Sequence, residues 1–138
     1  MDHALIIFLA WVFILSAIIF AIVCRNKGTK RLDVEYFRVK YLEIENKLNK
    51  VDVSTYHMPV IEADKLLDFA LKESGYGGNT MSERMKKANK IFSDRNGVWQ
   101  AHKLRNRIVH EPEIKTTYDE VRYAINCVKK ALKDLKAI

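Results

Sequence analysis

The sequence predicts an all-α protein in which a single-pass N-terminal transmembrane helix precedes an up-and-down helical bundle. Three observations lead to this class. Residues 4–24 form an uncharged apolar stretch, apolar side chains after it recur at steps of three and four residues, and no segment alternates with period two for long. Such steps are typical of helices that bury one face, and four short-looped helices after residue 58 would pack as a bundle. A chain of 138 residues has room for one small domain.

Residues 4–24 match a membrane-spanning helix in length and composition. Ser16 is their only polar side chain apart from the terminal cysteine. At about 1.5 Å per residue, the stretch matches a hydrocarbon core of about 30 Å, and in lipid its backbone must be helical. The alternative is a cleaved signal peptide, which would need a basic start, a shorter apolar stretch and a cleavage site between small residues. We therefore expect an anchor.

The basic residues around the stretch predict its orientation. Arg25, Lys27, Lys30 and Arg31 follow it, and no lysine or arginine precedes it. The positive-inside rule then places residues 1–3 outside and the C-terminal domain in the cytoplasm, on an inner or plasma membrane.

The two cysteines, Cys24 and Cys127, do not form a disulfide framework, as suits a reducing compartment. Cys24 could carry a palmitoyl group at the membrane edge, or it could be an unmodified cysteine there.

Net charge favours an anionic partner. The segment 25–138 holds all 24 basic residues and, because one acid (Asp2) precedes it, 16 of the 17 acidic ones, a balance of +8. Such an excess favours phosphate-bearing partners or anionic lipid. The alternative is a basic soluble surface that has no partner.

Residues 25–54 form a basic segment followed by one amphipathic helix. Gly28-Thr29-Lys30 is a short break, and a single apolar stripe follows it. The helix could be a coiled-coil stalk that dimerises beside the membrane, or a plain helix packed on the domain. The stripe consists of Val34, Phe37, Tyr41, Ile44 and Leu48.

Residues 55–138 contain the predicted bundle. A loop over 51–58 ends at Pro59, which opens the first helix because a first turn tolerates proline. The glycine-rich stretch 75–79 ends that helix. We interpret it as a C-cap and loop, because a phosphate-binding loop would need a preceding strand. A short basic helix then starts at Ser82 and includes Met85, Ala88, Ile91 and Phe92.

The two remaining helices are predicted after a turn at 94–97. One runs from about Val98 to His110, where Pro112 blocks its continuation. The other begins near Thr117. Its core face consists of Val121, Ala124, Ile125, Val128, Leu132 and Leu135.

The helix that ends at His110 carries two stripes. Ala101, Leu104 and Ile108 form a core stripe, whereas Gln100, Lys103 and Arg107 face water. A second stripe holds Trp99, His102, Asn106 and His110, and Arg105 lies on the seam between the two. We interpret the second stripe as an interface that also holds a site. An ordinary boundary face with Trp99 partly buried is the alternative.

This helix ends in the run Arg105-Asn106-Arg107-Ile108-Val109-His110, followed by Glu111-Pro112. The run resembles the R-polar-x(3–5)-H signature of the HEPN superfamily (higher eukaryotes and prokaryotes nucleotide-binding), and the resemblance covers about residues 55–138. Many members of that superfamily are metal-independent RNases. Their protomers typically pair so that two copies of the motif line one cleft.

The resemblance implies roles for the motif residues. Arg105 would bind the scissile phosphate, His110 would transfer the proton, and Asn106, one turn earlier, would orient the histidine ring. Attack by the 2′-hydroxyl would leave a 2′,3′-cyclic phosphate and a 5′-hydroxyl. The helix end would have to loosen before Pro112, because an ideal helix separates Arg105 and His110 by about 140°. Trp99, His102 and Arg107 are candidate substrate-binding or interface residues.

We expect no metal and no cofactor. His102 and His110 lie about 12 Å apart along the helix, and no cysteine or carboxylate cluster joins them. His3 and His57 are treated as background. The sequence shows no Ser-His-Asp grouping, nucleotide-binding fingerprint or deaminase signature.

These observations favour a membrane-anchored HEPN-type endoribonuclease of toxin or phage-defence type. It would cleave RNA as a homodimer. An antitoxin or another regulatory partner could control its activity. The first alternative is a non-catalytic module of the same fold that binds RNA or a nucleotide at the membrane. The second is a small structural membrane protein with a basic bundle.

Overall fold

The computed structural model describes residues 2–25, 31–111 and 113–138. All regular structure in these ranges is helical, which confirms the prediction of an all-α protein. The break at 28–30, the side chain of Cys24 and the stop at Pro112 lie outside the described residues. The helices are α1 (Asp2–Arg25), α2 (Val34–Lys47), η1 (Val53–Thr55), α3 (His57–Glu73), α4 (Met81–Ala88), α5 (Arg95–His110) and α6 (Tyr118–Asp134).

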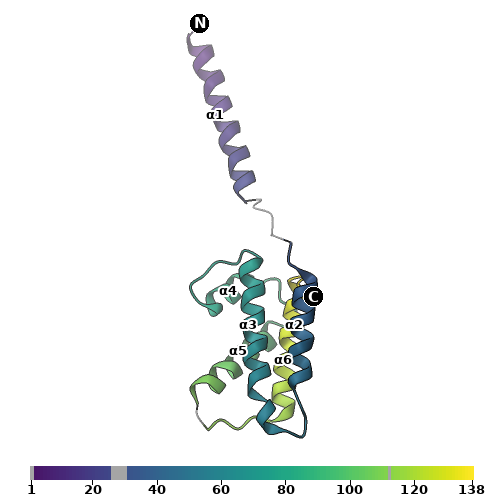
Figure 1. The fold of residues 1–138 in the computed structure, drawn as a ribbon. Coiled ribbons are helices and arrows are strands. Elements are labelled where there is room, and N and C mark those ends of the chain that lie inside the picture. Colours follow the sequence, from purple (N-terminus) through teal and green to yellow (C-terminus); the bar gives the residue numbers. More distant parts are fainter. Residues whose placement is uncertain (1, 26–30, 112) are drawn as a thin grey trace.

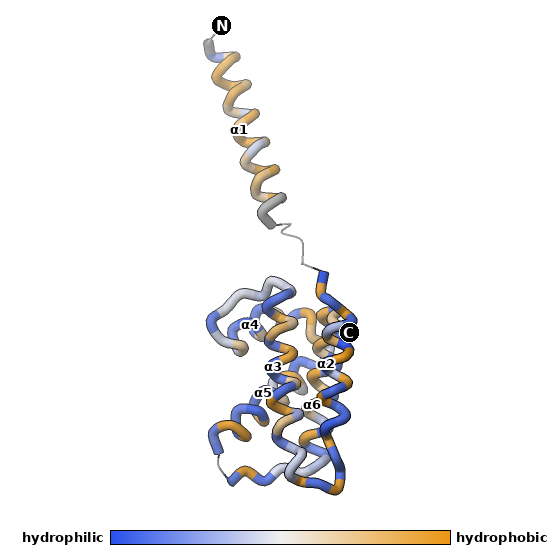
Figure 2. The backbone as a smooth tube through the Cα atoms, in the orientation of Figure 1, coloured by the Kyte–Doolittle hydropathy of each residue, from blue (hydrophilic) through white to orange (hydrophobic). Residues whose placement is uncertain are grey.

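Helix α1 is separate from the packed helices and is apolar along its length (Figures 1 and 2). The span His3–Ile22 has a mean hydropathy of 3.0, and none of it is buried. Its serine hydroxyl, on Ser16, donates a hydrogen bond of 2.8 Å to the carbonyl of Phe13, so this polar group is satisfied inside the helix. Length and composition are those that a membrane-spanning helix requires.

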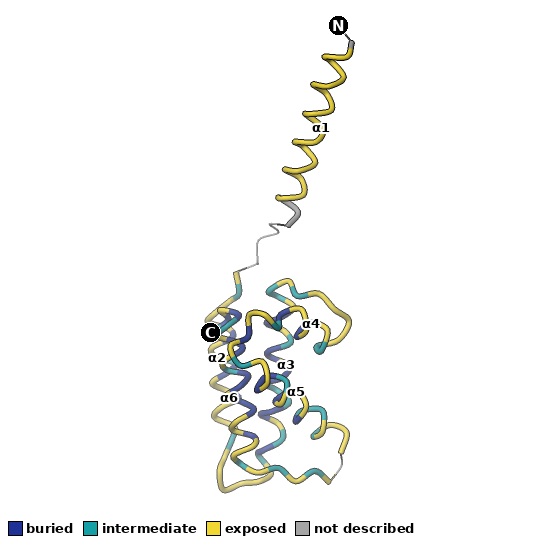
Figure 3. The backbone as a smooth tube through the Cα atoms, turned by 180° about the vertical axis from the view of Figure 1, so that it is seen from behind, coloured by how far each residue is buried: buried dark blue, intermediate teal, exposed yellow. Residues whose placement is uncertain are grey.

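The other long helices form a bundle around α3. Figure 1 shows α2, α3, α5 and α6 running up and down in alternation, and α3 packs against α2, α4, α5 and α6. Their buried faces point inward, toward one another (Figure 3). One continuous core results, and its largest fully buried side chains include Phe37, Tyr41, Leu67, Leu71 and Leu132.

Helix α2 belongs to this core. Phe37, Tyr41 and Ile44 are buried and lie in the same cluster as the side chains of α3 and α6. The apolar stripe predicted for this segment is therefore used within the chain, as expected for a helix packed on the domain. The packed helices accordingly include α2 as well as those after residue 55.

Helix α5 begins earlier than the sequence indicated. The predicted turn at 94–97 is wrong, because Asp94 is the N-cap of the helix and its Oδ1 accepts a 2.9 Å hydrogen bond from the N–H of Gly97. Gly97 also brings α5 close to α6. A Cβ at this position would lie 2.6 Å from Sγ of Cys127, so a larger residue does not fit.

The other helix limits agree in part with the predictions. Helix α3 begins at His57, two residues before Pro59. Helix α4 ends at Ala88, so Ile91 and Phe92 lie beyond it, although Phe92 is still buried. Helix α6 starts after Thr117, which forms a capping box with Glu120.

Helices α3 and α6 end in the same local motif. After α3, the N–H of Tyr76 donates to the carbonyl of Leu71 and the N–H of Gly75 donates to that of Lys72, which is a Schellman arrangement. Gly75 has φ +85°, as the predicted glycine C-cap requires. The same bonds follow α6, but there Lys136 takes the left-handed position with φ +58°.

Candidate functional site

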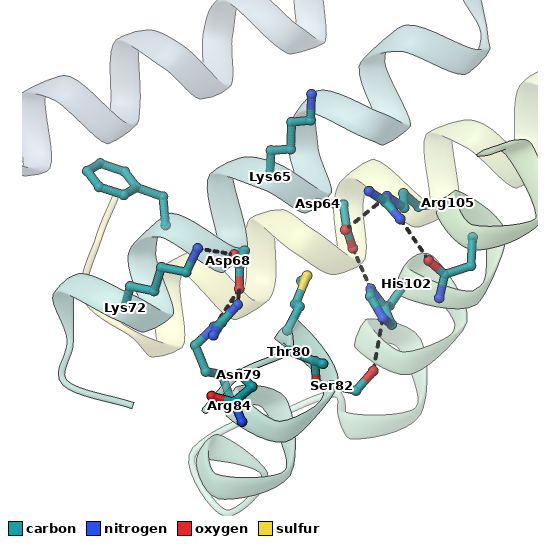
Figure 4. Close-up of a pocket in the computed structure, with 13 residues that line it drawn as sticks. Asp64, Lys65, Asp68, Lys72, Asn79, Thr80, Ser82, Arg84, His102 and Arg105 are labelled. Carbon is teal, nitrogen blue, oxygen red and sulfur yellow. Dashed lines mark hydrogen bonds and ion pairs between the residues drawn. The ribbon is translucent and has the colours of Figure 1, made fainter. Parts of the chain in front are cut away.

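A pocket of about 540 Å³ lies between α3, the start of α4 and α5. Helix α3 contributes Asp64 and Asp68 to its wall, and the start of α4 contributes Ser82. Helix α5 contributes His102 and two residues of the motif, Arg105 and Asn106. Figure 4 shows these side chains pointing toward one another across the pocket.

Asp64 and His102 form the buried centre of the site. Oδ1 of Asp64 lies 2.9 Å from Nδ1 of His102, and their side chains are only 7% and 10% exposed. A buried carboxylate needs hydrogen-bond donors, and the imidazole supplies one. The pair connects the central helix α3 to the helix that carries the motif.

Ser82 extends this pair into a chain of three residues. Its Oγ lies 3.2 Å from Nε2 of His102, on the opposite side of the ring from Asp64 (Figure 4). Ser82, His102 and Asp64 are therefore joined in that order. The expectation that the chain has no Ser-His-Asp grouping is wrong, because residues 20 and 38 positions apart in sequence meet only through the packing of α3, α4 and α5.

Arg105 reaches the other oxygen of Asp64. Its Nε lies 3.5 Å from Oδ2 of Asp64, and its Nη1 donates a 2.9 Å hydrogen bond to Oδ1 of Asn106. The Arg105 side chain is 27% exposed, so its charge is partly shielded from solvent. Arg105 and Asn106, two of the predicted catalytic residues, thus lie together at the pocket.

His110 lies elsewhere. It is the last residue of α5, its side chain is exposed, and it does not line the pocket. The helix stays regular up to its end, where the N–H of Glu111 donates to the carbonyl of Arg107 at 2.8 Å. The expected loosening before residue 112 is therefore wrong for the described residues, and a single chain does not bring His110 to Arg105.

The candidate interface residues are placed differently from one another. His102 is buried in the pocket wall, and the ring of Trp99, which is half-buried, meets it edge-on with centroids 6.3 Å apart. Arg107 is exposed, with its Nε 3.4 Å from Oε1 of Glu111. The second stripe of α5 is thus divided between a buried part and an exposed end.

The far side of the pocket is a charge network around Asp68. Arg84 is buried, contacts Oδ1 of Asp68 at 2.7 Å and donates to the carbonyl of Gly78, while Lys72 contacts Oδ2 at 2.8 Å. Burial raises the pKa of Asp68, but hydrogen bonds from Arg84 and Lys72 outweigh it and hold this pKa below its usual value. Asp68 is therefore ionised at neutral pH.

Sequence reasoning missed Asp64, Ser82 and Arg84. A signal for Asp64 was present, because a carboxylate occurs on the apolar face of α3 beside Ala63 and one turn before Leu67. A charged residue on a buried face needs a partner. Ser82 and Arg84 follow a helix start and gave no comparable signal.

The arrangement can serve acid–base or nucleophilic chemistry and can hold an anion. Within the described residues, no three His, Cys, Asp or Glu side chains gather into a group that could hold a metal ion. Comparison of the chain with protein-family models, with curated proteins and with solved structures gave no match.

Proposed function

We propose that this protein is a membrane-anchored, HEPN-type, metal-independent endoribonuclease. The observation that carries the proposal is the placement of Arg105, Asn106 and His110 on one helix, with the His110 ring exposed at its end. The run of residues resembles the superfamily's signature, and the helices around it form a bundle. The balance of +8 in residues 25–138 favours a polyanionic substrate.

The proposed reaction starts from the 2′-hydroxyl of RNA. His110 takes or gives the proton, because an imidazole can act as a general base or a general acid. The guanidinium of Arg105 stabilises the charge that develops on the phosphoryl oxygens. Asn106 holds Arg105 in place through the 2.9 Å hydrogen bond, a role that differs from the predicted orientation of His110.

Two copies of the chain would complete the reaction centre. His110 is exposed and does not line the pocket that holds Arg105, so a phosphate bound in that pocket would need the His110 of a second copy. Val109 lies one turn after Arg105 and is 49% exposed, which gives a pairing surface an apolar residue to bury. A homodimer, as expected from the resemblance, would place the motif helices side by side.

The anchor would hold this domain at the cytoplasmic face of an inner or plasma membrane. The motivation is the apolar helix α1 and the basic residues that follow it. An RNase in that position needs restraint, so an antitoxin or another regulatory partner is part of the proposal.

A non-catalytic module that binds RNA or a nucleotide is the second candidate. One observation favours it: Asp64 holds Arg105 half-buried, and this contact restricts the guanidinium. An arginine held in this way can bind a phosphate that enters the pocket without the exposed His110 taking part.

The test is incubation of the full chain, in detergent micelles, with single-stranded RNA in the presence and absence of EDTA. We expect cleavage that survives EDTA and leaves 2′,3′-cyclic phosphate ends. His110→Ala and Arg105→Ala should each lower the rate by about 100-fold. His57→Ala and Arg38→Ala are matched controls on α3 and α2, away from the motif helix, and should cleave as the wild type does.

Two results would count against the enzyme. Cleavage by His110→Ala at the wild-type rate would remove the mechanism. Salt-sensitive RNA binding without cleavage, weakened in Arg105→Ala, would establish the binding module in its place.

A further inference from the structure

The geometry points to a second activity: we infer that Ser82, His102 and Asp64 form a nucleophilic site that hydrolyses small anionic acyl esters. The site uses neither His110 nor a second copy of the chain. It rests on three side chains from three helices that meet at one wall of the pocket (Figure 4).

The order of contacts is that of a nucleophile, a base and an orienting carboxylate. Oγ of Ser82 is 3.2 Å from Nε2 of His102, and Nδ1 of the same ring is 2.9 Å from Oδ1 of Asp64. When Asp64 accepts the Nδ1–H, the tautomer is fixed and Nε2 is left to accept the Ser82 proton. Both distances are within the range in which proton transfer occurs.

The burial of the three residues differs as this role requires. His102 and Asp64 are buried, so water does not compete for their hydrogen bond. Ser82 is half-buried and lines the pocket, where a substrate reaches its hydroxyl. The hydrogen bond to Asp64 already satisfies Nδ1 of the ring. The Ser82 hydroxyl is therefore not needed to hold His102 in place and can react with a molecule in the pocket.

The start of α4 supplies donors for a developing negative charge. Thr80 caps the helix by accepting from the N–H of Glu83. The N–H groups of Met81 and Ser82, as the first two of the helix, have no acceptor one turn back within it. Both residues line the pocket, and the helix N-terminus carries partial positive charge.

The chemical step is an acyl transfer. Oγ of Ser82 forms a bond to the ester carbonyl carbon, its proton passes to Nε2 of His102, and the carbonyl electrons form an oxyanion. The oxyanion collapses, the bond to the leaving oxygen breaks, and that oxygen takes the proton from His102. Water then attacks the acyl-serine with the same base, which releases a carboxylic acid and restores the Ser82 hydroxyl.

The charges that line the pocket select the substrate class. The pocket is lined by four cationic side chains and by two carboxylates, those of Asp64 and Asp68. The electrostatic potential in the pocket is therefore positive. The volume of about 540 Å³ fits a small molecule. An acyl group that carries its own carboxylate is the substrate that this potential favours. The four cations are Lys65, Lys72, Arg84 and Arg105.

The test uses the full chain in detergent micelles and a fluorophosphonate probe. Attack by Ser82 replaces the P–F bond with an O–P bond, fluoride leaves, and the serine proton passes to His102. Peptide mass spectrometry should place one adduct on Ser82. Labelling should be absent in Ser82→Ala, at least 100-fold slower in His102→Gln, and unchanged in Ser93→Ala, which alters an exposed serine.

Ester hydrolysis gives a second readout. The p-nitrophenyl monoester of succinic acid should be cleaved at least tenfold faster than p-nitrophenyl butyrate, and this preference should shrink with added salt. Circular dichroism establishes that each variant is folded. A wild-type chain that takes up no probe and cleaves neither ester overturns the inference, as does labelling that persists in folded Ser82→Ala. Neither result bears on RNA cleavage, which depends on His110.

Discussion

Asp64 on α3 and His102 on α5 meet inside the bundle, with 2.9 Å between Oδ1 and Nδ1. Each side chain is the hydrogen-bond partner that permits the other to be buried. The contact also fixes the rotation of α5, because a turn of that helix about its axis would separate the pair. The position of Arg105 at the pocket depends on the same carboxylate.

Removal of the carboxylate should destabilise the fold. In Asp64→Ala, the buried ring of His102 loses its partner, and the free energy of unfolding should fall by about 2 kcal/mol. Asp64→Asn keeps an acceptor and should lose less. Urea denaturation followed by circular dichroism measures both. Glu43→Ala, which breaks an exposed ion pair with Lys40, should change stability little.

Lys136→Gly should stabilise the protein. Lys136 has φ +58°, a left-handed conformation that favours glycine. Relief of this strain should raise the free energy of unfolding by about 1 kcal/mol. The same substitution at Lys133, inside the last turn of α6, should instead lower it by about 1 kcal/mol. Equal effects at the two positions would contradict the assignment of strain to Lys136.

Stability should depend on pH through Asp68. Its pKa is lowered below 3.8 in the folded protein, because the hydrogen bonds from Arg84 and Lys72 outweigh burial. The stabilisation is therefore complete above the unfolded-state value and is lost as the pH falls through the folded one. Asp68→Asn should show a shallower loss of stability between pH 5 and the acid range. Asp119→Asn, at an exposed site, should follow the wild type. Thermal unfolding across this range measures the difference.

The domain should lie on the cytoplasmic side of the membrane. The basic residues from Arg25 to Arg31 motivate this orientation. Protease added outside intact spheroplasts should leave residues 31–138 uncut, whereas the same protease should digest them in inverted vesicles. Digestion in the intact spheroplasts would refute the orientation.

Much of the fold could be predicted because helical periodicity is a local property. Phe37, Tyr41 and Ile44 of the predicted stripe are buried, although Val34 is exposed, and the predicted core face of α6 is buried. The predicted helix limits were less accurate where a residue is typical of two different local structures. Asp94 is as typical of a turn as of an N-cap, and only the hydrogen bond to Gly97 distinguishes them.

The site was harder to predict because its parts come from distant segments. The sequence grouped His102 with Asn106 and His110 on one stripe, but a helical wheel does not show which neighbour covers each part of a stripe. Helix α3 brings Asp64 to His102 and leaves His110 exposed. The link from His102 to Ser82 depends in turn on α4, which packs on α3.

The residues that follow α6 limit where a tag can be joined to the bundle. Ala137 is fully buried and Ile138 packs on the core, at the end of the bundle where α2 begins (Figure 1). A reporter joined directly to Ile138 would pull these residues out of the core and would press against Arg31 and Leu32, which line a cavity with Leu135 and Lys136. A flexible spacer is therefore needed wherever a fusion follows Ile138 directly. An epitope inserted in the loop near Val51, which is 90% exposed, should disturb the core less.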